Sequence, residues 1–181
     1  MIRVVFVCLG NICRSPLAEG VFRQLVAERG LEALIQCDSA GTAAYHIGEL
    51  PDRRTRENAL EHGLRLTHRA RRLSGEDFSQ FDYFVAMDEA NFENILSLCQ
   101  RSTGLPNTDD NTFLLREFDP EPVGTGRGDM AVPDPYYEDA QFFEQVYQIV
   151  YRCCVNLLNY LMEQHAITPQ QNHHNQSVKK S

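Results

Sequence analysis

Apolar stretches of strand length and of helix length alternate along this chain of 181 residues. The apolar run at 2–7 has the length of a strand, and the segment 16–26 places Leu17, Val21 and Leu25 at helical spacing after a Ser15–Pro16 start. The same patterns predict strands at 34–37, 81–87 and 112–115, a turn at 38–42, and helices at 51–62, 89–99 and 141–162. Strands that alternate with helices are typical of a parallel sheet covered on both faces.

The predicted fold is therefore α/β: a single-domain, doubly wound, parallel four-stranded sheet with helices on both faces. We expect one folded domain over 1–165 and a disordered polar tail over 166–181, where Gln, Asn, His, Ser and Lys dominate. The last helix carries an apolar stripe, in which we interpret Cys153 as a packing residue. The stripe consists of Phe142, Val146, Ile149, Val150, Cys153, Leu157, Leu158 and Leu161.

The chain carries a net charge of −8, which argues against binding of nucleic acid through a broad basic face. Fifteen of the seventeen basic residues are arginine, and the two lysines, Lys179 and Lys180, lie in the tail. Mechanisms that need a lysine in the folded domain are thereby excluded, among them a pyridoxal Schiff base and a Walker-type phosphate loop.

The sequence shows neither a secretion signal nor an apolar stretch of membrane-spanning length, so we expect a cytoplasmic protein without a membrane span. In that compartment the six cysteines are expected to be reduced thiols. Their spacing matches no zinc-binding pattern, and neither a metal ion nor a cofactor is expected. The sequence does not specify an oligomeric state, and we expect a monomer.

Cys8 ends the first predicted strand, and the loop Cys8–Ser15 leads directly into the first predicted helix. The start of a helix presents unpaired backbone N–H groups and the positive end of the helix dipole, which together bind phosphate. The same positive end and Arg14 favour the thiolate form of Cys8 over the thiol. Ligands of parallel sheets also bind beyond the carboxyl ends of the strands. The loop therefore predicts an anion site and a nucleophile at one point.

Such a site suits the hydrolysis of a phosphate monoester. The planar guanidinium of Arg14 can bind two phosphate oxygens, and attack by the thiolate would form a phosphocysteine and expel the alcohol. A leaving alkoxide needs a proton, so we expect a carboxylic acid nearby. A lone cysteine at a strand end is more often a buried core thiol; the arginine and the helix start that follow Cys8 favour the catalytic interpretation.

These residues resemble the active-site loop of the low-molecular-weight protein tyrosine phosphatase family. The resemblance extends from about Ile2 to Met162. Besides the loop it includes Asp38-Ser39-Ala40-Gly41-Thr42, the segment 58–68 with His68-Arg69-Ala70-Arg71, Phe81-Asp82-Tyr83, Met87-Asp88-Glu89 and Asp134-Pro135-Tyr136-Tyr137.

The resemblance implies a role for each matching residue. Cys8 would be the nucleophile, Arg14 the phosphate clamp, and Asp134 the acid that protonates the leaving phenol and then the base for the hydrolytic water. Ser39 and His68 would support the loop, together with Asn11 and Ser15. The substrate-binding residues implied in this way are Leu9, Gly10, Asn11, Ile12, Cys13, Ser15, Tyr45, Tyr136 and Tyr137. From the residues alone, ordinary loop packing stays open for the three tyrosines, and a turn role for Asp134.

Two loop residues carry finer expectations from the same resemblance. Cys13 resembles a second cysteine that forms a reversible disulfide with the nucleophile under peroxide; two readily ionised thiols five residues apart would allow this protection. Phosphatases of this kind that act on phosphoarginine carry threonine at the position of Ile12, so isoleucine favours phosphotyrosine. The predicted substrates are phosphotyrosine-containing proteins.

Two other functions use a similar anion loop. An arsenate reductase would need a pair of resolving cysteines near 80–95, and this chain offers only Cys99 in that region. A non-catalytic phosphoanion-binding module would have no need for Cys8, Arg14 and Asp134 together. The sequence therefore favours the phosphatase.

Overall fold

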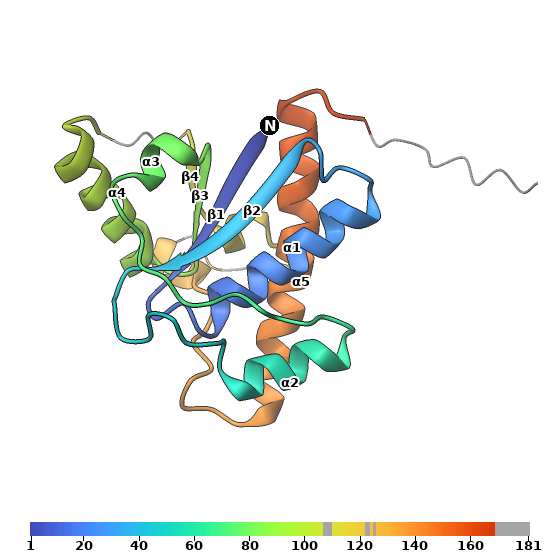
Figure 1. Cartoon of the computed structure of the whole chain (residues 1–181). Coiled ribbons are helices and arrows are strands. Elements are labelled where there is room, and N and C mark those ends of the chain that lie inside the picture. The colour runs from blue at the N-terminus through green and yellow to red at the C-terminus, as the bar shows by residue number, and fades with distance from the viewer. Residues whose placement is uncertain (107–109, 122–123, 125, 169–181) are drawn as a thin grey trace, which may run out of the picture.

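The structure is a computed structural model that describes residues 1–106, 110–121, 124 and 126–168. Its centre is a sheet of four parallel strands in the order β2-β1-β3-β4. The strands are β1 (Ile2–Cys8), β2 (Ile35–Gly41), β3 (Tyr83–Ala86) and β4 (Thr112–Leu114). This architecture confirms the predicted α/β fold, and Figure 1 shows helices on both sides of the sheet.

The central strand β1 is buried on both faces, which explains its unbroken apolar run. Val4 and Phe6 point to the face covered by α1 (Arg14–Glu28) and α5 (Ala140–Gln164). Val5 and Val7 point to the other face, which is covered by α3 (Asp77–Gln80) and α4 (Glu89–Thr103). Because successive side chains of a strand alternate, one strand supplies both layers of the core.

The predicted turn at 38–42 is wrong, because β2 continues to Gly41. Ser39 pairs with Phe6 and Gly41 pairs with Cys8 in the parallel register. The local sequence is polar, but the side chain of Ser39 is fully buried and donates a hydrogen bond to Glu19 on α1. Long-range pairing with β1 therefore extends the strand beyond its apolar part.

The remaining helices deviate from their predicted bounds by a few residues. Helix α2 spans Arg53–Glu61 and begins after Asp52, whose side chain accepts a hydrogen bond from the N–H of Arg54. Helix α4 runs four residues past the prediction and ends at Gly104, which has a φ of 72°. The short α3 and the 3₁₀ helices Leu115–Phe118 and Arg127–Met130 were not predicted.

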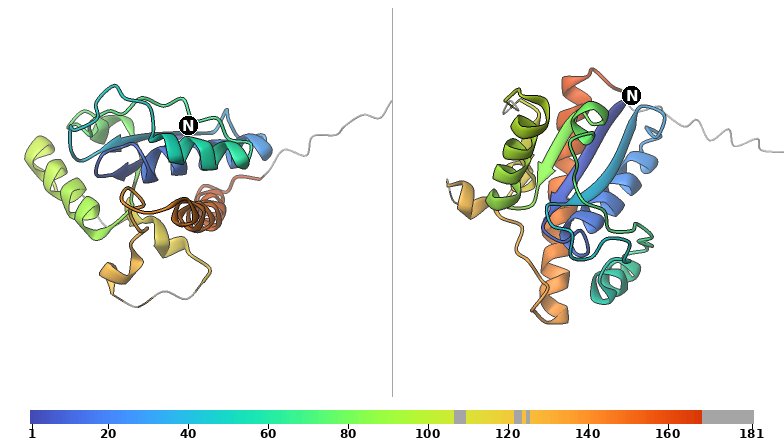
Figure 2. Two further views of the ribbon diagram at one scale, coloured as in Figure 1. Left: turned by 90° about the horizontal axis from the view of Figure 1, so that it is seen from below. Right: turned by 60° about the vertical axis from the view of Figure 1, so that its left-hand side comes forward.

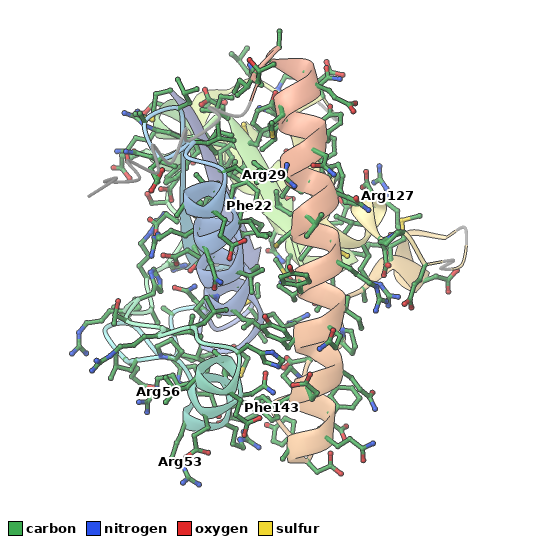
Figure 3. All side chains as sticks on the ribbon, turned by 90° about the vertical axis from the view of Figure 1, so that its right-hand side faces the viewer. Phe22, Arg29, Arg53, Arg56, Arg127 and Phe143 are labelled. Carbon is green, nitrogen blue, oxygen red and sulfur yellow. The ribbon has the colours of Figure 1, made fainter. Side chains whose placement is uncertain are left out.

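Helix α5 extends well beyond the carboxyl ends of the strands, where α2 packs against it (Figure 2). Six of the eight residues of the predicted stripe are buried, and packing against α2 as well as against α1 and the sheet widens the buried face of the helix. Phe142 and Ile149 are only partly buried, whereas Phe143 is buried and lies between α5 and α2 (Figure 3). Tyr147 and Cys154 are also buried, and Cys153 packs in the core as expected.

The predicted tail lies, from residue 169 onward, outside the described residues. Ile167 is described: its N–H binds the carbonyl of Met162, and its side chain packs against the core. Within the described part of the chain, no helix is long and apolar enough to cross a membrane.

Candidate active site

The loop between β1 and α1, residues 8–15, is held from behind by the end of β2; we call it the phosphate loop. Thr42 donates its N–H to the carbonyl of Cys8, and Ala43 donates to the carbonyl of Leu9, each at 2.9 Å. A Cβ atom at Gly41 would lie 2.7 Å from the carbonyl oxygen of Leu9. Glycine at this position therefore lets the loop lie directly on β2.

Asn11 fixes the shape of the phosphate loop. Its backbone is left-handed, with a φ of 56°, a conformation that asparagine tolerates better than most residues. Its buried amide donates to Ser15 Oγ and to Ser39 Oγ, both at 2.9 Å. Its Oδ1 accepts from the N–H of Arg71 at 2.9 Å and lies 2.8 Å from His68 Nε2. The amide thus uses its full hydrogen-bonding capacity to join three segments of the chain.

The same network continues to two carboxylates that the sequence did not single out. Ser39 Oγ donates to Glu19 Oε2 at 2.6 Å. His68 Nδ1 lies 3.1 Å from Glu19 Oε2 and 3.5 Å from Asp38 Oδ1. Both ring nitrogens of His68 therefore lie within hydrogen-bonding distance of oxygen atoms of the network. Ser39 and His68 thus both contact the phosphate loop through Asn11.

The Glu19, Asp38 and His68 side chains also form a group whose ligand atoms lie within 4.8 Å of one another, close enough for a metal ion. Arginines already bind both carboxylates: Arg23 pairs with Glu19, and Arg71 pairs with Asp38 at 2.9 Å. We interpret this group as a support for the loop, because its negative charge is balanced by side chains of the protein.

The thiol of Cys8 lies at the centre of the phosphate loop. Its Sγ is 2.9 Å from Ser15 Oγ and accepts the N–H of Asn11 at 3.2 Å. The sulfur therefore lies within hydrogen-bonding distance of the backbone of the loop and of Ser15.

Arg14 is buried and shared between two carboxylates. Its Nη1 binds Asp88 Oδ2 at 2.8 Å and the carbonyl of Val132 at 3.1 Å, and its Nη2 is 3.3 Å from Asp134 Oδ2. Burial by itself would lower the pKa of Arg14, but the sulfur of Cys8 and the two aspartates outweigh it and raise the pKa. Asp88 follows β3, and its position at the carboxyl end of a parallel strand is the signal that could have identified it.

Asp134 reaches the site on the long segment that precedes α5. Val132 anchors this segment: it is fully buried, and its N–H donates to the carbonyl of Met87 at 2.7 Å. Asp134 stands between two prolines, and its side chain is 47% exposed. The anchor at Val132 and the two prolines restrict the backbone, and the segment thereby places the exposed carboxylate of Asp134 beside Arg14, far away in the sequence.

One pocket of about 260 Å³ collects most of the predicted site residues. Asn11 and Ser15 do not line it but hold the loop from behind. His46, which the sequence did not identify, lines the pocket beside Gly10, where a Cβ atom would lie 3.1 Å from the histidine ring. The lining residues that had been predicted are Cys8, Leu9, Gly10, Ile12, Cys13, Arg14, Tyr45, Asp134, Tyr136 and Tyr137.

Arg54 holds the tyrosine segment beside the pocket. Its Nη2 donates to the carbonyl of Tyr136 at 2.8 Å, and its guanidinium lies over the rings of Tyr136 and Phe143 at 5.7 and 4.7 Å. Asp52 keeps the guanidinium in place with an ion pair of 3.0 Å. Arg54 therefore connects α2 to the segment that carries Asp134.

Cys13 differs from the expectation of a readily ionised thiol. The side chain is buried, and this burial raises its pKa to about 12. Only the thiolate attacks other sulfur atoms, so Cys13 is a slow partner for disulfide formation at neutral pH.

The fold and the site together define a class: α/β proteins in which a phosphate-binding loop carries a cysteine and an arginine. The family model for low molecular weight phosphotyrosine protein phosphatases matches residues 3–167 of the chain. The chain therefore belongs to this family, and it is a tyrosine phosphatase.

Individual relatives agree with the family. The low molecular weight phosphotyrosine protein phosphatase of Rattus norvegicus is 41% identical over 151 residues, which are 83% of this chain and 90% of the relative. A protein tyrosine phosphatase structure from Entamoeba histolytica matches with a TM-score of 0.78 and 35% identity, covering 91% of this chain and 99% of that one. A drosophila arginine phosphatase matches with a TM-score of 0.79 and 30% identity, covering 88% and 98%.

Proposed function

We propose that the protein hydrolyses phosphotyrosine in other proteins by a metal-independent reaction in which Cys8 is the nucleophile. The observation that carries this proposal is the meeting of Cys8, Arg14 and Asp134 in one pocket. Each of the three comes from a different place in the fold: the end of β1, the start of α1 and the segment before α5.

The first half of the proposed reaction forms a phosphocysteine. Backbone N–H groups of the phosphate loop and the guanidinium of Arg14 bind the phosphate oxygens and leave the phosphorus facing Cys8. The thiolate forms the S–P bond while the P–O bond to the phenol breaks. Asp134 gives its proton to the leaving phenolate oxygen, so tyrosine departs as a neutral phenol.

The second half restores the enzyme. The carboxylate of Asp134 takes a proton from a water molecule, whose oxygen attacks the phosphorus. The S–P bond breaks, its electron pair returns to the sulfur of Cys8, and inorganic phosphate leaves.

Aromatic and aliphatic walls support the choice of phosphotyrosine. Ile12 and Leu9 line the pocket near the loop, and Tyr45, Tyr136 and Tyr137 line it further out. An aryl ring can pack against these surfaces, whereas the charged guanidinium of phosphoarginine gains less from an isoleucine. The drosophila arginine phosphatase shares the fold, so the side chain at Ile12 is the feature to test.

A reductase is not supported by the position of Cys99. This thiol is buried in α4, contacts Thr103 and the carbonyl of Leu105, and does not line the pocket.

We also propose that the protein is cytoplasmic. All six cysteines are free thiols, which supports this location.

Hydrolysis of para-nitrophenyl phosphate in the presence of EDTA tests the mechanism. We expect turnover by the wild-type protein, none by Cys8→Ser, and near wild-type turnover by Cys99→Ser, a matched change of a cysteine outside the pocket. Activity of Cys8→Ser equal to the wild type would exclude the proposed nucleophile. Phosphotyrosine and phosphoarginine peptides of one sequence then test the substrate; faster hydrolysis of the phosphoarginine peptide would contradict the assignment.

A further inference from the structure

A second cavity, of about 370 Å³, lies between α4 and the segment 72–74, and we call it the side groove. Helix α4 lines it with Asn94, Leu98 and Arg101, whose spacing places them on one face of the helix. Thr42, Arg72 and Ser74 line the opposite side. The described residues that line the side groove include two arginines and no carboxylate, although the net charge of the chain is −8.

Several other arginines near the active site are held by contacts within the protein. Around the active site Arg71 is bound by Asp38 and Asp77, and Arg53 by Glu57. Arg69 and Arg56 donate to backbone carbonyls, and Figure 3 shows Arg53 and Arg56 on the outer side of α2.

The guanidinium groups of Arg72 and Arg101 have no hydrogen bond, ion pair or aromatic contact within the residues that the structure describes. Asp77, which binds the N–H of Ser74, is already paired with Arg71. The described residues therefore leave two cations of one cavity without a neutralising partner, and a bound anion would be attracted to both. The hydroxyls of Ser74 and Thr42 and the amide of Asn94 offer further hydrogen bonds to its oxygens.

The side groove and the active-site pocket are separated by the short segment 42–46. Thr42 lines the side groove and binds the carbonyl of Cys8 through its N–H, while Tyr45 and His46 line the pocket. The backbone of Arg72 forms an isolated parallel β-bridge with Gly41, and Gly41 is paired on its other side with Cys8 in the sheet. Two strand spacings separate the backbones of Arg72 and Cys8 by about 10 Å, which an extended peptide covers with about three residues.

Arg101 lies further from the active site. Asp88, at the start of α4, binds Arg14, and Arg101 follows thirteen positions later on the same helix. At a rise of 1.5 Å per residue this is about 20 Å, or about six residues of an extended peptide.

We propose that the side groove binds phosphate or carboxylate groups that the protein substrate carries about three and about six residues from its phosphotyrosine. This proposal rests on the proposed function of the active-site pocket. It gives the enzyme a preference among phosphotyrosine sequences that the pocket itself cannot supply. Two arginines on one groove suit such oxyanions because each guanidinium can bind two oxygens.

Two phosphotyrosine peptides test the proposal. One carries aspartate at the third and sixth positions before and after the phosphotyrosine, and the other carries asparagine at the same four positions. The measured quantity is the ratio of kcat/KM for the acidic over the neutral peptide, in which general effects on catalysis cancel. We expect a ratio of about ten for the wild type, a reduction of about threefold for each of Arg72→Gln and Arg101→Gln, and a ratio near one for the double variant. Arg65→Gln is the matched control, because Arg65 is exposed and does not line the groove.

A free anion is the alternative occupant, and titration with inorganic phosphate followed by amide NMR distinguishes it. One outcome is that phosphate shifts the amide signals of Ser74 and Leu98 in the wild type but not in the double variant, while both proteins have the same kcat/KM ratio for the two peptides. This outcome would assign the groove to a free anion and overturn the proposal of a substrate-borne group. An unchanged ratio without such shifts would overturn the oxyanion site altogether. Neither result affects the Cys8→Ser test, which reports on the active-site pocket alone.

Discussion

Arg14 Nη2 lies 3.3 Å from Asp134 Oδ2, so the group proposed to bind phosphate is joined to the group proposed to donate the proton. Asp88 holds the other terminal nitrogen of Arg14 at 2.8 Å. A phosphate group that enters the pocket competes with Asp134 for Nη2, while Asp88 keeps the guanidinium in position. Binding of the substrate would thereby release the carboxyl group of Asp134 for the leaving oxygen.

Replacement of the acid should slow the first chemical step. For Asp134→Asn we expect kcat/KM, which reports only on steps up to the release of the phenol, to fall by about 10² to 10⁴ with phenyl phosphate, because general acid catalysis is worth that much when the leaving group is basic. The loss should be smaller with para-nitrophenyl phosphate, whose leaving group needs little protonation. Steady-state rates over a series of substituted phenols measure this difference. Glu138→Gln, a change of an exposed acid on the same segment, should leave the rates unchanged; a loss independent of the leaving group would argue against an acid role.

Removal of Asp88 should affect both affinity and stability. The side chain caps α4 by accepting the N–H of Asn91, and it is the nearer carboxylate partner of the buried Arg14. We expect Asp88→Ala to lower the stability by about 3 kcal/mol, since it leaves a buried charge with less compensation. The inhibition constant of inorganic phosphate should rise by about 10- to 100-fold because Arg14 is no longer oriented.

Asp139→Ala is the control for the cap alone. Asp139 caps α5 by accepting the N–H of Phe142 and does not line the pocket. Urea denaturation should show a loss of about 1 kcal/mol, with the phosphate inhibition constant unchanged. Equal effects of the two variants on phosphate inhibition would remove Asp88 from the site.

Two substitutions of Asn11 separate backbone strain from the hydrogen-bond network. Asn11→Ala loses the amide and keeps a side chain in the left-handed region, whereas Asn11→Gly loses the amide but relieves the strain. We expect the glycine variant to be about 1 kcal/mol more stable than the alanine variant in thermal unfolding. Both should lose most of their turnover, because Ser15, Ser39 and His68 then each lose the hydrogen bond that ties them to Asn11. Wild-type turnover of Asn11→Gly would show that only the backbone conformation matters.

The raised pKa of Cys13 predicts how its reactivity depends on pH. With a pKa of about 12, only about one in 10⁴ of these thiols is ionised at pH 8. We expect alkylation of Cys13 by iodoacetamide to rise about tenfold per pH unit from pH 8 to 10, and peptide mapping of the folded enzyme measures this. A peroxide-induced disulfide between Cys8 and Cys13 should likewise form faster at pH 9 than at pH 7. Rates that do not change with pH would show that Cys13 is already ionised.

The same shift affects stability at alkaline pH. The pKa of the folded state lies above that of an unfolded cysteine, about 8.5, so unfolding releases a proton between about pH 9 and 12. The contribution of this thiol is therefore complete below about pH 8.5 and is lost as the pH rises, at about 1.4 kcal/mol per pH unit. Urea denaturation of the wild type and of Cys13→Ala at pH 8 and 10 should show a shallower decline for the variant; parallel declines would contradict the raised pKa.

The sequence by itself was sufficient for the parts of the site that are contiguous in the chain. Cys8, Arg14 and the helix start lie within a few residues, and their order fixes which groups face one another. The alternation of strands and helices likewise predicts the parallel sheet. A short strand with an unbroken apolar run, such as β1, must be buried on both faces, and a parallel sheet covered by helices provides this burial.

Tertiary structure decided everything that depends on pairing or burial between distant segments. Ser39 and Gly41 belong to a strand because β1 pairs with them, and Asp88 belongs to the site because β3 ends beside Arg14. Removal from water sets the pKa of Cys13, and the contacts of the folded chain separate Arg72 and Arg101 from the arginines that are already bound. Local sequence determines the conformation of a loop, but only the packed chain determines which charges meet and which lose their water.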